Sequence, residues 1–261
     1  MTATRRRLDA ELVHRKLFAS RSAAREAIDS GSVELEGVVT PKPSTLVAPN
    51  AAVRVVGSAP RFVGRGGLKL EAALDHFDID VVNRTALDVG ASTGGFTDCL
   101  LQRGATRVVA VDVGYGQLDW RLRSDSRVEP VERTNIRHAD LASLGAPFEV
   151  VVVDLSFISL ITVAPALRTA GEEATDYVVL VKPQFEVGKK EVGKGGIVRD
   201  PELHRTALLR VAAGLEDHGL GAFGAVASPI TGAKGNREFL LWCRIAPAAM
   251  TPSELEAVTQ P

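Results

Sequence analysis

The sequence has few of the features that mark secreted, disulfide-rich or membrane-spanning proteins. It contains two cysteines in 261 residues, Cys99 and Cys243, and neither has the spacing of a metal ligand. We expect both to be small buried hydrophobic side chains in a reducing cytoplasm. A run of about 18 apolar residues, which a membrane span needs, is absent. The arginine-rich N-terminus also lacks the apolar core of a secretory signal, so a cytoplasmic protein is predicted.

Charge is nearly balanced over the chain but unevenly divided along it. Residues 1–65 hold 11 Lys+Arg and 6 Asp+Glu, a balance of +5. The remaining residues hold 20 and 26, a balance of −6, and the two parts together give the net charge of −1. A basic module joined to a mildly acidic body indicates a polyanionic partner for the basic part. Ordinary solvated surface charge explains a balance of this size equally well.

The first 60 residues have the pattern of a small α+β unit. Four apolar residues near its start have close to helical spacing: Leu8, Leu12, Leu17 and Phe18. A second helix is predicted over Arg21–Asp29, with Gly31 ending it. A hairpin is predicted over residues 33–39 and a last strand over residues 54–56.

From about residue 84 the pattern alternates between strands and helices, which predicts a doubly wound, Rossmann-like α/β sheet. The predicted strands are residues 85–89, 107–112, 128–131, 149–154, 177–182, 222–227 and 238–245. The predicted helices are residues 94–103, 159–169 and 201–217. We expect an N-terminal domain over 1–59, a linker over 60–64, an α/β domain over 65–246, and a tail over 247–261 that is a frayed helix or disordered.

A loop of small residues joins the first predicted strand of the α/β domain to its helix. Its sequence, from Asp88 to Thr97, is DVGASTGGFT. Glycines let the backbone approach a ligand, and free N–H groups at the helix start would face it. Asp112 ends the next strand, 22 residues after Gly90, close to the offset of about 20 residues for an acid that binds ribose hydroxyls. A nucleotide-like cofactor is therefore predicted. The candidate cofactor residues are Asp88, Gly90, Ala91, Ser92, Thr93, Gly94, Gly95, Phe96, Asp112, Asn135 and Asp154.

Charged residues also stand at the ends of predicted buried strands. Asp154 ends one strand and Lys182 ends the next, where open α/β sheets bind their ligands. Lys69 lies near the start of a helix whose dipole opposes its charge, so it needs an anionic neighbour, and Asp154 is a candidate. Glu238 opens the last strand, where it could also be an ordinary edge charge.

Longer motifs resemble two known families. The residues RLD (7–9), SR (20–21), AREAI (24–28) and GSVELEG (31–37) resemble the S-four RNA-binding domain. The positions of Lys69, Asp154, Lys182 and Glu238 resemble the Lys-Asp-Lys-Glu tetrad of the FtsJ-like 2′-O-ribose RNA methyltransferases. The combination is similar to the two-domain TlyA family, whose motifs stand here as GRGGLKL, DVGASTGGFT, DVGYGQL, ERTN, DLSFISL and KPQFEVGK. The linker departs from that family, because Arg61-Phe62-Val63 stands where members often have a tryptophan.

The resemblance implies an S-adenosylmethionine-dependent methyltransferase that acts on cytidine riboses in ribosomal RNA of both subunits. It implies Lys182 as the general base, Lys69 and Asp154 as neighbours that set its charge, and Glu238 as a partner of the second lysine or of the ribose. Asn135 would approach the adenosyl group. In the S-four-like segment the candidate RNA contacts are Arg7, Arg15, Lys16, Arg21 and Arg25, and Arg65 is a further candidate. Residues 188–196 are predicted to form a flexible loop with three lysines directly after Lys182; its Lys189 and Lys190 would suit an RNA backbone, although a long solvated loop explains them as well.

Three other functions are weighed against this one. A non-catalytic ribosome-binding or assembly factor would keep the fold without needing the tetrad. A haemolysin-like membrane-active protein, a label attached to this family, would need a basic amphipathic helix or a span, and the sequence offers neither. A dinucleotide oxidoreductase would need a GxGxxG loop, which is absent. Neither a metal nor an obligate protein partner is expected.

Overall fold

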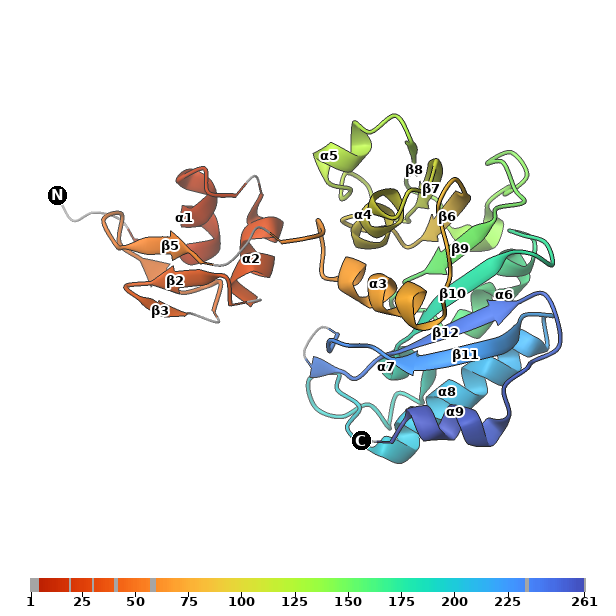
Figure 1. The fold of residues 1–261 in the computed structure, drawn as a ribbon. Coiled ribbons are helices and arrows are strands. Elements are labelled where there is room, and N and C mark those ends of the chain that lie inside the picture. The colour runs from red at the N-terminus through yellow and green to blue at the C-terminus, as the bar shows by residue number, and fades with distance from the viewer. Residues whose placement is uncertain are drawn as a thin grey trace. The chain divides into compact units, whose positions relative to one another are not determined.

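The computed structural model describes residues 5–18, 20–29, 31–39, 42–56, 60–232 and 235–260. The chain forms two compact units, with the boundary between Arg65 and Gly66 (Figure 1).

The N-terminal unit places two short helices, α1 (Leu8–His14) and α2 (Arg21–Asp29), against each other. Its three-stranded antiparallel sheet has the order β3-β2-β5, built from β3 (Val38–Val39), β2 (Val33–Leu35) and β5 (Val53–Val55). The predicted second helix, hairpin and last strand are therefore present. A pairing that the sequence pattern did not indicate joins β1 (Arg6–Arg7) to β4 (Leu46–Val47).

The first helix is shorter than the apolar spacing indicated. It ends at His14, because Lys16 has a φ of +59° and the amide of Leu17 turns back to the carbonyl of Leu12. Leu17 is consequently exposed rather than part of the helical stripe. The small core holds Leu8, Leu12, Ala24, Ala27, Ile28, Val33 and Val47.

The C-terminal unit is built on a seven-stranded sheet with the order β11-β12-β10-β9-β6-β7-β8. Five neighbouring strands are parallel: β6 (Thr85–Val89), β7 (Arg107–Val111), β8 (Val128–Val131), β9 (Val150–Val153) and β10 (Asp176–Val181). The last strand, β12 (Phe239–Arg244), runs antiparallel between β10 and β11 (Gly221–Ala227). The sheet is Rossmann-like, as predicted, with β12 as its reversed strand.

Helices cover the sheet (Figure 1). They are α3 (Gly66–His76), α4 (Gly95–Gln102), α5 (Trp120–Arg123), α6 (Leu160–Arg168), α7 (Pro183–Glu186), α8 (Pro201–Glu216) and α9 (Pro252–Val258), with a 3₁₀ turn at Ile136–His138. Side chains of α6, α8 and α9 join alternate residues of the central strands, such as Val151 and Val153, in the main core. Helices α3 and α4 pack against each other. Among the described residues, every helix is too short or too polar to cross a bilayer.

The C-terminal segment is more ordered than its composition indicated. Thr251 and Glu254 form a reciprocal capping box at the start of α9, and Leu255 is buried at 4% exposure. The guanidinium of Arg237 donates hydrogen bonds to the carbonyls of Thr259 and Gln260. Of the two expectations for the tail, a frayed helix or disorder, the structure has the helix over residues 252–258; this helix buries an apolar side chain, and both of its ends have hydrogen-bond partners.

Candidate active site

The loop between β6 and α4 brings its backbone against the end of β9. Gly90 has a φ of +90°, and a Cβ atom at this position would lie 2.3 Å from the carbonyl oxygen of Asp154. Any larger residue would therefore push two neighbouring strand ends apart. The glycine predicted to let the backbone approach a ligand also lets β6 and β9 meet at the carboxyl edge of the sheet.

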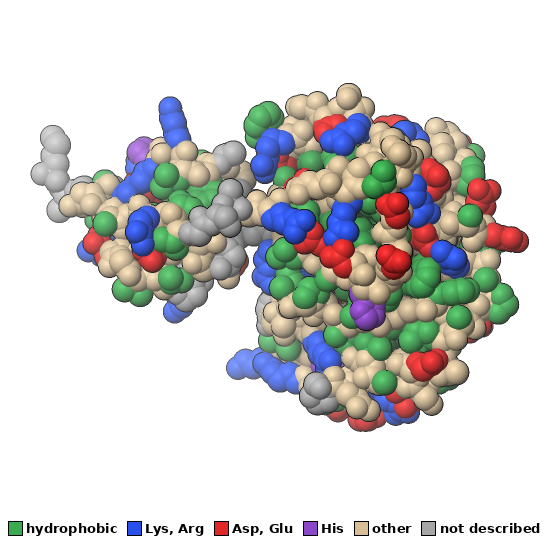
Figure 2. Space-filling view, viewed as in Figure 1, with side chains coloured by type: hydrophobic (Ala, Val, Ile, Leu, Met, Phe, Trp, Pro, Cys, Tyr) green, Lys and Arg blue, Asp and Glu red, His purple; other side chains and the backbone are tan. Residues whose placement is uncertain are grey.

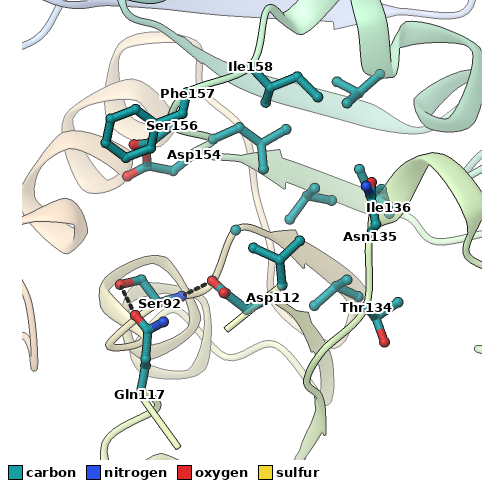
Figure 3. A pocket seen from close by; sticks show the side chains of 16 residues that line it. Ser92, Asp112, Gln117, Thr134, Asn135, Ile136, Asp154, Ser156, Phe157 and Ile158 are labelled. Atoms are coloured by element: carbon teal, nitrogen blue, oxygen red, sulfur yellow. Dashed lines mark hydrogen bonds between the residues drawn. The ribbon is translucent and has the colours of Figure 1, made fainter. Parts of the chain in front are cut away.

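Asp112 is held in a fixed orientation at the end of β7. Its Oδ2 accepts a hydrogen bond of 2.8 Å from the backbone N–H of Ser92, and its Oδ1 accepts one of 2.6 Å from Gly114. The dashed line from Asp112 to Ser92 in Figure 3 shows how this contact ties the carboxylate to the glycine loop. One amide donor on each oxygen leaves further acceptor capacity, because a carboxylate has about four lone-pair sites.

A cavity of about 440 Å³ opens beside this carboxylate (Figure 3). Five of the predicted cofactor residues line it: Gly90, Ser92, Asp112, Asn135 and Asp154. The other six lie outside its lining, because they form the strand, the far side of the loop and the buried start of α4: Asp88, Ala91, Thr93, Gly94, Gly95 and Phe96. Sequence reasoning missed lining residues that follow strand ends, such as Gln117, Thr134 and Ile158.

Asp88 has a structural position within β6. Its side chain is fully buried, and its Oδ2 accepts a hydrogen bond of 2.6 Å from the Thr97 hydroxyl in α4. Its Oδ1 has no hydrogen-bond partner among the described residues. Burial raises the pKa of Asp88 to about 7, although the Thr97 hydroxyl opposes this shift and the nearby Asp154 carboxylate adds to it.

Asn135 and the residues around it form the far wall of the cavity. The side-chain oxygen of Asn135 accepts a hydrogen bond from the amide of Arg137 and so caps the 3₁₀ turn Ile136–His138. This cap fixes the backbone of residues 134–136 along the cavity.

The four tetrad residues form two ion pairs. Lys69, in the first turns of α3, contacts Glu238 at 2.5 Å, and both side chains are buried. Lys182 forms an ion pair with Asp154. Asp154 and Lys182 meet because β9 and β10 are parallel neighbours whose carboxyl ends lie at the same edge.

The expected pairing of Lys69 with Asp154 is therefore wrong. The reversed strand β12 begins at this edge and places Glu238 beside Lys69, while Asp154 faces the lysine of the adjacent strand. The alternative that Glu238 holds the second lysine matches the geometry.

A second cavity, of about 400 Å³, adjoins the tetrad. Its lining includes both lysines, Glu238 and Asn236. It also includes Ser156 and Phe157, which line the first cavity as well. The two cavities therefore meet at the segment that follows β9. Ser156 and Phe157 were not among the predicted site residues, although their position directly after a buried strand was a usable signal.

The loop of residues 188–196, which follows α7 and carries three lysines, is held at its far end by a residue that lines the second cavity. The Nδ2 of Asn236 donates to the carbonyl of Gly196, and its Oδ1 accepts from the amide of Val198. Lys189 and Lys190 are exposed on the loop. Asn236 is buried and lies two residues before Glu238.

Three of the arginines predicted to contact RNA converge on one acid in the N-terminal unit. Arg7, Arg21 and Arg25 contact the carboxylate of Asp9 at 2.8–3.1 Å. Asp9 is fully buried beneath them, whereas their own side chains are 43%, 53% and 51% exposed. The guanidinium groups hold the pKa of Asp9 well below its usual range. Figure 2 shows Lys and Arg side chains at the surface of this unit.

The other predicted RNA contacts are placed differently. Arg15 directs its guanidinium to the carbonyls of Ala51 and Pro49 and to the Glu11 carboxylate. It therefore ties α1 to the loop before β5. Lys16 is the residue with positive φ that ends α1, and Arg65 is partly buried just before α3.

Both parts of the chain match known protein families. The family model of the FtsJ-like methyltransferases matches residues 62–245, and the model of the S4 domain matches residues 6–53. The chain is 51% identical over 243 residues to the 16S/23S rRNA (cytidine-2′-O)-methyltransferase TlyA of Mycobacterium tuberculosis, which covers 93% of this chain and 91% of that protein. The chain belongs to the TlyA family of FtsJ-like methyltransferases.

Two further relatives of the family bear a different name. Hemolysin A of Brachyspira hyodysenteriae is 40% identical over 236 residues, covering 90% of this chain and 98% of that protein. A solved structure from Streptococcus thermophilus, also described as a hemolysin, superposes with a TM-score of 0.78 at 38% identity, covering 98% of this chain and 95% of that one. These names say what the relatives are called and do not identify an activity of this chain.

The cofactor of this methyltransferase is S-adenosylmethionine, and the first cavity fits it. Gly90 lines the cavity with backbone atoms alone, and Asp112 offers a fixed carboxylate with acceptor capacity suited to a ribose diol. Among the described residues, no cluster of three or more His, Cys, Asp or Glu side chains has the arrangement of a metal site.

Proposed function

We propose that this enzyme methylates the ribose 2′-hydroxyl of cytidines in ribosomal RNA of the small and large subunits. The observation that carries the proposal is the meeting of the two cavities at Ser156 and Phe157, with the Lys182–Asp154 and Lys69–Glu238 pairs beside the second cavity. The acceptor class and the nucleotide follow from the M. tuberculosis relative, whose name specifies cytidine 2′-O-methylation of 16S and 23S rRNA.

The reaction joins the ribose 2′-oxygen to a methyl carbon as the carbon–sulfur bond breaks and the hydroxyl proton leaves. S-adenosylmethionine supplies the electrophilic methyl group. In its neutral form Lys182 takes the proton of the 2′-hydroxyl, and the Asp154 carboxylate stabilises the ammonium group that results. Lys69, held in place by its ion pair with Glu238, stabilises the negative charge that develops on the oxygen.

The N-terminal unit supports RNA binding by its charge and its arginine cluster. Half-exposed guanidinium groups on a buried carboxylate have a fixed place and still have N–H donors for phosphates. We assign Arg7, Arg21, Arg25 and Lys16 to phosphate contacts, with Arg65, Lys189 and Lys190 as further contacts. We assign Arg15 to stability of the unit, because its donors bind backbone carbonyls.

The test is ribose-methylation mapping by mass spectrometry of rRNA from purified small and large subunits after incubation with enzyme and S-adenosylmethionine. We expect a 2′-O-methylcytidine in each subunit with wild-type protein. Lys182→Ala should reduce the rate by about 10²–10⁴, the usual effect of losing a general base, with little change in cofactor or RNA affinity. A Lys182→Ala protein with a near wild-type rate would contradict the assigned base.

The same experiment separates the alternatives. A ribosome-binding assembly factor would bind subunits and leave their riboses unmethylated. Methylation in one subunit alone would confine the proposal to that subunit. Calorimetry with S-adenosylmethionine and with NAD distinguishes a methyltransferase from a dinucleotide oxidoreductase, because the second would bind NAD.

A further inference from the structure

Ser156 lies where the first cavity, which fits the cofactor, meets the second cavity beside the tetrad. We call these two cavities the cofactor cavity and the acceptor cavity. Ser156 follows Asp154 by two residues in the segment after β9, and it lines both cavities. Its hydroxyl oxygen accepts a hydrogen bond of 3.0 Å from Nζ of Lys182. Ser156 itself is exposed, so its hydroxyl is not part of the core.

The Lys182 amino group thus has two protein partners of different kinds. The Asp154 carboxylate supplies charge, and the Ser156 hydroxyl supplies a neutral acceptor. A lysine ammonium has three N–H bonds, which rotate together around the last carbon–nitrogen bond. The Asp154 carboxylate alone fixes this rotation but leaves two directions open to the lone pair, and the Ser156 hydroxyl occupies one of these two. The third tetrahedral direction is then fixed, and it is the direction of the lone pair once a proton has left.

We propose that Ser156 is a positioning residue of the methyl transfer, which orients Nζ of Lys182 so that its lone pair points to the 2′-hydroxyl of the acceptor ribose. The inference rests on the proposed function, because it requires Lys182 to be the base. Ser156 acts through Lys182 and takes no proton itself.

The neutral character of Ser156 matters to this role. A second carboxylate at this place would favour the ammonium form of Lys182 beyond the effect of Asp154 and so oppose its action as a base. A hydroxyl favours the ammonium form much less, since a neutral acceptor binds a charged donor more weakly than a carboxylate does. The other charged groups at the acceptor cavity, Lys69 and Glu238, are paired with each other.

The experiment compares Ser156→Ala with Ser156→Thr in the full chain, with purified ribosomal subunits as substrate. Ser156→Ala should lower kcat by about tenfold or more, the effect of a misplaced reacting group. The KM for subunits and the Kd for S-adenosylmethionine should stay unchanged. Ser156→Thr keeps the hydroxyl and should restore most of the rate. Ser143→Ala is the matched control, because its hydroxyl binds a carbonyl of a surface turn, and it should have no effect.

The pH dependence of kcat gives a readout that a merely structural role would not move. A hydroxyl acceptor binds the ammonium more strongly than the neutral amine, so its removal favours the neutral form. The ascending limb of the Ser156→Ala profile should therefore move to lower pH while its plateau falls. A pH profile of kcat for Ser156→Ala that matches the wild type would overturn the inference. An unchanged kcat with a raised KM for subunits, or with a raised Kd for S-adenosylmethionine, would overturn it as well.

Comparison of the two single variants separates this inference from the proposed function, and a double variant tests whether Ser156 acts through Lys182. If Lys182→Ala is inactive and Ser156→Ala behaves like wild type, Ser156 has no positioning role and the base assignment stands. If Lys182→Ala stays active, the base assignment fails and the inference fails with it. Ser156→Ala combined with Lys182→Ala should be no slower than Lys182→Ala alone, because Ser156 acts through that lysine. An additive loss in the double variant would contradict the inference.

Discussion

At the residue scale, identical charges have different roles because their surroundings differ. Asp88, Asp112 and Asp154 all stand at or just beyond strand ends at the same edge of the sheet. Asp112 is bound by two backbone amides and faces the cofactor cavity, whereas Asp154 pairs with a lysine. Asp88 is fully buried with one hydroxyl donor. On these environments we propose Asp112 for ligand binding and Asp154 for the reacting centre, whereas Asp88 belongs to the core.

Asp112→Ala should weaken S-adenosylmethionine binding by about tenfold or more. Losing a hydrogen bond to a charged group typically costs about 1.5–3 kcal/mol, which corresponds to that change in affinity. Isothermal titration calorimetry measures the effect. The melting temperature of the variant is measured as a control for folding, because the backbone amides of Ser92 and Gly114 lose their acceptor. A folded variant with unchanged affinity would show that this carboxylate does not contact the cofactor.

Asp88 should make the protein less stable as the pH rises. Its folded pKa of about 7 lies above the ordinary value of 3.8, so the folded state retains a proton that the unfolded state has lost. This contribution to the free energy of unfolding is complete below pH 3.8 and is lost by about pH 7. Asp88→Asn should flatten this part of the profile, measured by urea unfolding between pH 5 and 8. A profile of unchanged slope would argue against a raised pKa.

At the element scale, Asp9 connects the helix pair of the N-terminal unit. The acid lies in α1, two of its partners lie in α2, and Arg7 precedes α1. Without the carboxylate, three guanidinium groups would repel one another beside the small core. The unit has few buried apolar residues, so it depends on such a contact more than the larger unit does.

Asp9→Asn should lower the melting temperature of the N-terminal unit, and each kcal/mol lost should lower it by roughly 4–8 °C. The pKa of Asp9 is lowered, so its stabilisation is present above the ordinary carboxyl range and is lost as the pH falls. The difference between variant and wild type should thus be large at neutral pH and small in acid. Glu34→Gln is the control, since it removes the pair with the exposed Arg54. Equal effects of the two variants would contradict a special role for Asp9.

At the scale of the whole molecule, we propose that the N-terminal unit makes most of the RNA contacts and that the chemistry belongs to the C-terminal unit, where Lys189 and Lys190 add further contacts. The cofactor cavity and all four tetrad residues lie in the C-terminal unit. The arginine cluster lies in the N-terminal unit. Phosphate contacts made by arginines release counterions, so subunit binding should weaken steeply as salt increases.

A protein that begins at Gly66 should bind S-adenosylmethionine as the full chain does and lose most methylation of ribosomal subunits. The full-length Arg7→Ala, Arg21→Ala, Arg25→Ala variant should lose subunit affinity and show a shallower salt dependence. Filter binding at several salt concentrations, with methylation measured in parallel, checks both. Full methylation by the shortened protein would show that the N-terminal unit does not dock the substrate.

Much of the fold could be predicted from sequence because the signals are local. The buried valine runs, the glycine loop and the acid 22 residues after Gly90 depend on neighbouring residues in the chain. The family motifs also indicated the four tetrad residues. The end of α1 was misjudged and the C-terminal helix was one of two expectations, because a positive φ at Lys16 and the capping contacts of α9 leave weak traces in composition.

The sequence by itself determined which side chains reach the carboxyl edge of the sheet, since strand ends follow from hydrophobic pattern. Tertiary structure alone decided how those side chains pair. Glu238 reaches Lys69 because β12 is reversed, and Asp154 reaches Lys182 because β9 and β10 are neighbours in register. Strand order and direction depend on contacts between residues far apart in the chain, such as the 169 positions between Lys69 and Glu238. A local pattern carries no record of such pairings, because their energy exists only once the sheet has formed.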